Sequence, residues 1–133
     1  MEEAHAGYLD HLIARIYRSL DDVRILRRDE TTEVQILEVE GTYRTYRIVI
    51  SEILSPEGRK YAFYVLDKSD AVVMGFDNSP DYTAVRMKYG DQYRQHIGER
   101  VPHRHGHRRE SIRVTPEMTL EAFILWVEKN LEE

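Results

Sequence analysis

The sequence predicts an α+β fold: a twisted antiparallel β-meander of five to six strands, with N- and C-terminal amphipathic helices packed on one face. Two segments near the chain ends repeat apolar residues at helical spacing. The region between them is rich in β-branched and aromatic residues that alternate with polar ones. Short turns separate these apolar runs, and connections this short join antiparallel neighbours. The 133 residues suit one domain over residues 1–133, without a repeat or linker.

The first helix is predicted from apolar residues that recur every three or four positions before Asp21, namely Leu9, Leu12, Ile13, Ile16 and Leu20. Five strands follow, at residues 23–28, 32–39, 43–54, 60–66 and 71–76. The Ser55-Pro56-Glu57-Gly58 segment suits a type I turn between two of them. A sixth short strand is expected at residues 111–114.

The remaining two elements are helical. Residues 82–95 have mixed polarity, and we expect an excursion from the sheet with one short helix before Gly90. Thr115-Pro116-Glu117 combines a capping hydroxyl, a first-turn proline and an acid, so the last helix is expected to start there. Its buried stripe comprises Leu120, Phe123, Ile124, Val127 and Leu131.

Positive charge is concentrated in one region. Residues 85–114 hold eight basic and three acidic residues, a local charge of +5 in a chain whose net charge is −5, together with four of the six histidines. An anionic ligand is therefore compatible with this region despite the acidic total.

The segment 102–109, PHRHGHRR, carries the strongest functional pattern. In an extended strand His103, His105 and His107 would share one face at a spacing of about 6.6 Å, and Arg104 and Arg108 would project from the other. Such a segment suits either a phosphate held between an acid and a base or a metal ion.

Acid and base catalysis at a phosphodiester is the leading interpretation. A histidine pKa near about 6.5 lets one ring accept a proton and another donate one at neutral pH. We expect His105 to be catalytic, with His103 or His107 as its partner. Asp77, at the end of a strand, would fix the tautomer of an imidazole. Three guanidinium groups would bind phosphate, from Arg104, Arg108 and Arg109.

This chemistry needs no metal or other cofactor, but two alternatives stay open. His103, His105 and His107 are also suitable ligands for a zinc-like ion, although the neighbouring arginines would oppose a cation. The segment would otherwise be a solvated surface or a contact patch for a partner protein. For Asp77-Asn78, the structural alternative is an Asx turn.

A second pattern suits single-stranded nucleic acid, because rings stack on bases and cations contact the backbone. In residues 82–94 tyrosines alternate with basic residues, namely Tyr82, Tyr89 and Tyr93 with Arg86, Lys88 and Arg94. RNA is therefore an expected partner. The alternative is that one or two of these tyrosines cover the edge of the sheet.

The motif order also resembles a known family. YAFYVLD and VVMGFDN in residues 61–78, followed by PHRHGH at 102–107, resemble the TumE-like toxins of bacterial and archaeal type II toxin–antitoxin modules. The resemblance implies a toxin encoded beside a cognate antitoxin protein, with growth arrest as the outcome. It maps the family's motif positions onto Asp77, Asn78, His103, His105 and His107.

The sequence thus favours a toxin-like, metal-independent endoribonuclease. The alternatives are a non-enzymatic module that binds nucleic acid or antitoxin, and a histidine-ligated metalloenzyme. Without a cysteine, a signal-peptide pattern or an apolar run of membrane-spanning length, we expect a cytoplasmic protein that does not bind membranes. A homodimer is compatible with the sequence.

Overall fold

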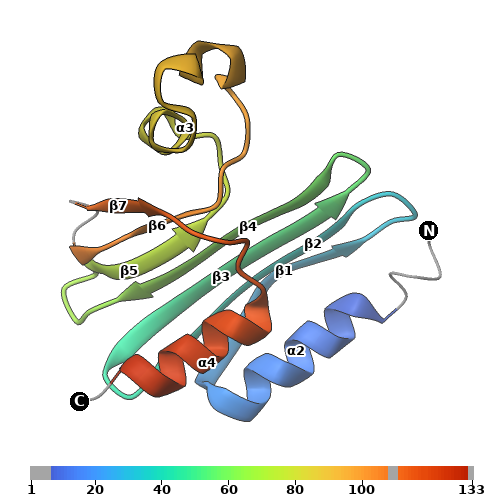
Figure 1. Ribbon diagram of the computed structural model, residues 1–133. Coiled ribbons are helices and arrows are strands. Elements are labelled where there is room, and N and C mark those ends of the chain that lie inside the picture. Colours follow the sequence, from blue (N-terminus) through green and yellow to red (C-terminus); the bar gives the residue numbers. More distant parts are fainter. Residues whose placement is uncertain (1–6, 108–110, 132–133) are drawn as a thin grey trace.

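The computed structural model describes residues 7–107 and 111–131. They form one antiparallel sheet in which the strands follow chain order (Figure 1). The strands are β1 (Asp21–Glu30), β2 (Gln35–Tyr43), β3 (Tyr46–Ser55), β4 (Gly58–Leu66), β5 (Val72–Asp77), β6 (His103–His105) and β7 (Ile112–Val114). The α+β meander is confirmed, with seven strands among the described residues rather than five to six.

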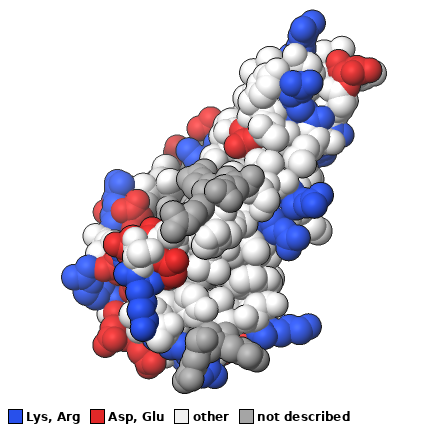
Figure 2. All heavy atoms as spheres, turned by 90° about the vertical axis from the view of Figure 1, so that its left-hand side faces the viewer, with Lys and Arg blue, Asp and Glu red and all other residues white. Residues whose placement is uncertain are grey.

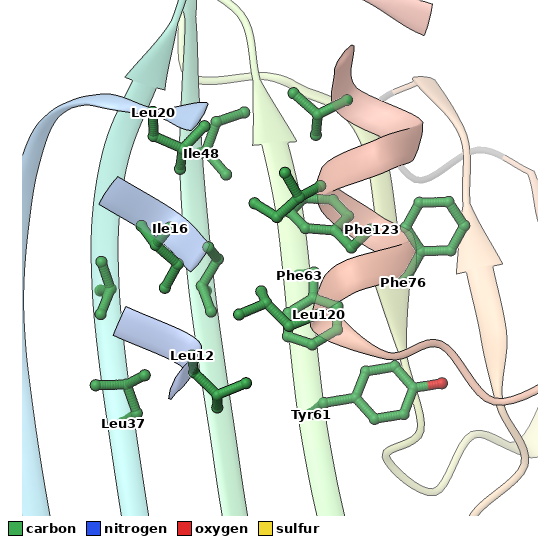
Figure 3. Packing of buried hydrophobic residues seen from close by; sticks show 14 of the residues in the cluster. Leu12, Ile16, Leu20, Leu37, Ile48, Tyr61, Phe63, Phe76, Leu120 and Phe123 are labelled. Carbon is green, nitrogen blue, oxygen red and sulfur yellow. The ribbon is translucent and has the colours of Figure 1, made fainter. Parts of the chain in front are cut away.

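Helices α2 (Tyr8–Ser19) and α4 (Leu120–Asn130) cover the same face of the sheet, as predicted. Figure 3 shows Leu12, Ile16 and Leu20 facing β2 and β3, and Leu120 and Phe123 facing β4 and β5. The ring of Phe123 stacks on Phe63 at a centroid distance of 5.1 Å and meets the edge of Phe76. Burying each such ring contributes about 1.5–3 kcal/mol, so this layer supplies the main core.

Strand alternation separates the two faces of β5. Phe76 pairs with Phe63 and lies in the core beneath α4. Asp77, the next residue, therefore faces the opposite side of the sheet. The polar end of β5 is placed away from the helix layer.

Between β5 and β6 the chain leaves the sheet to form α3 (Tyr82–Tyr89) and the 3₁₀ helix η1 (Gly90–His96). Asp81 caps α3 by accepting a hydrogen bond from the Ala84 amide at 2.9 Å. The two helices project beyond one end of the sheet (Figure 1) and share a small apolar cluster with the following strands, composed of Ala84, Val85 and Val101 with Tyr89, Tyr93 and Ile112. The short helix expected before Gly90 is confirmed.

The predicted start of the last helix is wrong. The Thr115 amide donates to the carbonyl of Pro102 at 3.0 Å, so this residue continues the pairing of the β6 and β7 segments. The cap is Thr119, whose hydroxyl accepts from the Ala122 amide at 3.1 Å. The first residue of the cap-like triplet is thus used for strand pairing, and α4 starts at Leu120.

None of the helices in the described part of the chain has the length and hydrophobicity of a transmembrane segment.

Candidate functional site

The pairing of β5 with β6 brings together residues far apart in sequence. Asp77 lies opposite His103, and Gly75 lies opposite His105. These four positions share the sheet face that α2 and α4 do not cover. Arg104 pairs with Phe76 and projects from the other face, where it is exposed.

The Asp77 carboxylate is the centre of the group. Its Oδ1 atom lies 3.1 Å from His103 Nε2, and its Oδ2 atom lies 3.6 Å from His105 Nε2. The Tyr64 hydroxyl donates to Oδ2 at 2.6 Å. The amide and hydroxyl of Ser79 donate to Oδ1 at 3.0 and 2.7 Å.

Asp77 is held as a carboxylate. Burial alone would raise its pKa, but the hydrogen bonds from His103, Tyr64 and Ser79 outweigh burial and hold that pKa well below its usual value. The contacts to Ser79 also form the Asx turn considered from the sequence, and the imidazole contact is present as well. Both interpretations of this aspartate therefore describe the same side chain.

The second ring nitrogen of His103 is also engaged. Its Nδ1 lies 2.7 Å from the carbonyl oxygen of Val101, which can only accept, so Nδ1 carries a proton. Burial lowers the pKa of His103, while the hydrogen bonds to Asp77 and Val101 raise it, and the net direction is upward. The ring meets His105 edge to face at a centroid distance of 4.8 Å.

All three side chains are buried. His103 is 1% exposed, Asp77 3% and His105 5%. One ligand-type atom from each residue lies within 4.8 Å of the others, which is close enough for one metal ion. One carboxylate and two imidazoles thus lie together in a site that is almost fully buried, and His105 is the most exposed of the three.

The expected row of three histidines is confirmed for only two. β6 ends at His105, and the Gly106 amide then pairs with the Ser111 carbonyl at 3.1 Å. His107 is exposed and does not belong to the group around Asp77. Arg108 and Arg109, expected to bind phosphate, lie outside the described residues.

Sequence reasoning missed Tyr64 and Gly75. These two residues are cross-strand neighbours in β4 and β5. A Cβ atom on Gly75 would lie 2.2 Å from Tyr64 Cε1, so the ring occupies the space above the glycine. The only available signal was a tyrosine in an alternating strand, and it did not indicate which neighbour the ring would cover.

Asn78 has a structural role. Its Oδ1 accepts from the Tyr61 amide at 3.0 Å, and its Nδ2 donates to the Arg59 carbonyl at 2.8 Å. The side chain thereby extends the pairing of β4 with the end of β5 and fixes the strand that carries Asp77.

The tyrosines and cations expected to bind RNA lie on the α3 and η1 projection, where Figure 2 shows basic side chains with acidic ones among them. We call Tyr82, Arg86, Tyr93 and Arg94 the tyrosine–arginine surface. The Arg86 guanidinium lies 5.6 Å from the Tyr82 ring centroid and 5.0 Å from that of Tyr93. Arg94 lies 5.6 Å from the Tyr93 ring. Three of the four side chains are exposed, and that of Tyr93 is half-buried.

Tyr89 and Lys88 are used differently. The Tyr89 ring stacks on His96 at 3.6 Å with an interplanar angle of 5°, and both side chains bond to Glu99. Lys88 Nζ lies 5.2 Å from the centroid of the same ring. Tyr89 is therefore engaged within the projection, while the tyrosine–arginine surface faces outward.

Comparisons with protein-family models, curated proteins and solved structures find no match to this chain. The resemblance to TumE-like toxins stays a prediction.

Proposed function

We propose that this protein is a toxin-type endoribonuclease whose reaction centre is formed by Asp77, His103 and His105. The observation that supports this proposal is an ionised carboxylate placed 3.1 and 3.6 Å from two imidazole nitrogens. Cleavage of RNA through its own 2′-hydroxyl requires one group that accepts a proton and one that donates a proton. Two histidines beside one aspartate provide both.

The roles follow from exposure and bonding. His105 is the more exposed imidazole and is the candidate to contact the reacting phosphodiester. His103 is bonded at both ring nitrogens, which suits a proton reservoir or a positioning group. Asp77 orients the rings and stabilises the positive charge that one of them acquires.

The tyrosine–arginine surface is the proposed RNA contact. Exposed rings stack on unpaired bases, and guanidinium groups contact phosphates in two-point geometry. Asp81 caps α3 and also contributes to the electrostatics of His103, so the projection starts close to the reaction centre.

The proposed setting is the cytoplasm, where a cognate antitoxin would bind the toxin and block its centre. The expected biological result is growth arrest that coexpressed antitoxin relieves.

Burial favours a second candidate, a non-enzymatic module that binds nucleic acid or antitoxin. His103 and His105 are 1% and 5% exposed, so the two rings present little surface to a substrate. In this alternative the cluster only fixes the edge of the sheet, and the tyrosine–arginine surface alone binds the partner.

The deciding experiment measures cleavage and binding of a fluorescent single-stranded RNA. His105→Ala should abolish cleavage, whereas His107→Ala, a change at an exposed histidine of the same segment, should retain it. Circular dichroism confirms that both variants fold. Salt-sensitive binding without cleavage by the wild type would favour the binding module, and cleavage by folded His105→Ala at the wild-type rate would remove His105 from the mechanism.

A further inference from the structure

We propose that Asp77, His103 and His105 together bind one divalent transition-metal ion. The ligand atoms are the Nε2 atoms of the two histidines and a carboxylate oxygen of the aspartate. This inference goes beyond RNA cleavage and does not depend on it, because an ion at this position is equally compatible with a binding module.

The spacing of the three side chains fits a shared ion. Bonds of about 2.0–2.1 Å from nitrogen and oxygen to zinc place neighbouring ligands of a tetrahedral site about 3.4 Å apart. His103 Nε2 lies 3.1 Å from Asp77 Oδ1, and His105 Nε2 lies 3.6 Å from the other carboxylate oxygen, Oδ2. All three ligand-type atoms lie within 4.8 Å of one another.

The orientation of His103 supports a cation between the ring and the carboxylate. Because Nδ1–H bonds to the Val101 carbonyl, the Nε2 atom of a neutral ring directs its lone pair at Asp77 Oδ1, 3.1 Å away. With Nδ1 held by this carbonyl, Nε2 is the ring nitrogen that faces Asp77 and is the atom that would bind an ion.

The residues around the cluster are those that orient metal ligands. A ligating histidine usually donates its other ring N–H to a carbonyl or carboxylate, as His103 does to Val101. Ligating carboxylates are themselves hydrogen-bonded, and here Tyr64 and Ser79 donate to Asp77. Arg104 is one of the arginines whose positive charge was expected to oppose a bound cation. It projects from the opposite face of β6.

The ligand set indicates the class of ion. Two imidazoles and one carboxylate suit Zn²⁺, Fe²⁺, Co²⁺ or Ni²⁺, whereas Ca²⁺ and Mg²⁺ prefer oxygen atoms throughout. Three protein ligands leave a coordination position for water or substrate, as in catalytic zinc sites. With an ion bound, the Nε2 atoms of both histidines are ligands and do not exchange protons with RNA, so the acid and base catalysis proposed above would belong to the metal-free form.

The test measures binding of Zn²⁺ and Co²⁺ to chelator-treated full-length protein, without RNA. Calorimetry should give one ion per chain, and bound Co²⁺ should show the visible absorption of a low-coordinate nitrogen and oxygen site. His105→Ala should weaken the affinity by at least about a hundredfold, since it removes a ligand. The matched control is His107→Ala, which should bind the ion as the wild type does.

Thermal unfolding gives a second readout. Because the ion binds only the folded state, excess Zn²⁺ should raise the Tm of the wild type and of His107→Ala by several degrees, but not that of folded His105→Ala. Folded wild-type protein that takes up neither ion would overturn the proposal. Equal loss of affinity in the two histidine variants would do the same, because it would place the ion on the exposed segment.

Discussion

The ring of Tyr64 lies over Gly75, and this close approach determines where the Tyr64 hydroxyl meets Asp77. We predict that Gly75→Ala destabilises the protein by about 1–3 kcal/mol, because the new methyl group would enter the ring and force it away from the strand. Urea denaturation measures the loss in the free energy of unfolding.

The matched control is Gly106→Ala. Among the described residues, its new Cβ would come close to the Ser111 side chain, whose Oγ atom, 2.3 Å away, can rotate, so we expect a smaller loss. Equal stability of the wild type and Gly75→Ala would show that the Tyr64 ring has room to move and that the glycine is not required.

For single residues, the sequence was sufficient to predict those that form a motif, but it was insufficient to predict the contacts that support them. His103, His105 and Asp77 were predicted because their residue types have few roles besides chemistry or polar bonding. His107 was wrongly placed in the same row, since the end of a three-residue strand depends on the turn that follows. Tyr64 reaches Asp77 through a cross-strand neighbour, and the register that sets this neighbour is a property of the whole sheet.

The start of helix α4 also depends on contacts that the sequence pattern did not reveal. Thr119 caps the helix, whereas the predicted cap, Thr115, has a buried hydroxyl without a hydrogen-bond partner in the described structure. We predict that Thr119→Ala destabilises the protein by about 0.5–2 kcal/mol, since the Ala122 amide loses its acceptor.

Thr115→Ala is the comparison. Removing a hydroxyl that makes no bond should change stability little or increase it slightly. Thermal and urea unfolding of both variants measure the difference. A larger loss for Thr115→Ala than for Thr119→Ala would contradict the position of the cap.

Strands β2, β3 and β4 were predicted because their nine or ten residues are rich in β-branched and aromatic side chains. Alternation in β3 and β4 also identified a buried face, through Tyr46, Ile48 and Ile50 and through Tyr61, Phe63 and Val65. The short strand expected at residues 111–114 is β7, but β6 and β7 have three residues each, too few for a period that would show their place in the sheet. They form because the chain returns from α3 and η1 beside β5. That return depends on the small cluster around Val85 and Val101, whose contacts are not local in sequence.

At the scale of the whole molecule, the helix layer and the sheet meet at Glu52. This buried acid lies on the helix side of β3 and is 1% exposed. Tyr8 of α2 donates a hydrogen bond to one of its oxygens, and Arg59 of β4 lies 3.0 Å from the other. Arg59 also donates to the Met118 carbonyl at 2.8 Å, just before α4. Helix α2 and the sheet therefore share one ionisable group, and Arg59 links it to the segment before α4.

Burial raises the pKa of Glu52 above its usual value, although Arg59 lowers it in part. The folded state then retains a proton at a pH where the unfolded state has released it. The contribution of Glu52 to stability is therefore complete below its unfolded pKa and is lost as the pH rises through its folded pKa. Since glutamine does not titrate, Glu52→Gln should gain stability relative to the wild type as the pH rises from about 4 to 7.

Glu40→Gln provides a control of opposite sign. Arg24 hydrogen-bonds to Glu40, outweighs the opposing effect of burial and lowers the pKa of this glutamate. The wild type should therefore gain stability relative to Glu40→Gln as the pH rises through the same range. Urea unfolding at several pH values compares the two variants, and parallel profiles would mean that Glu52 is solvated rather than buried between the layers. Opposite slopes would place a contact that weakens as the pH rises where α2, the sheet and the segment before α4 meet.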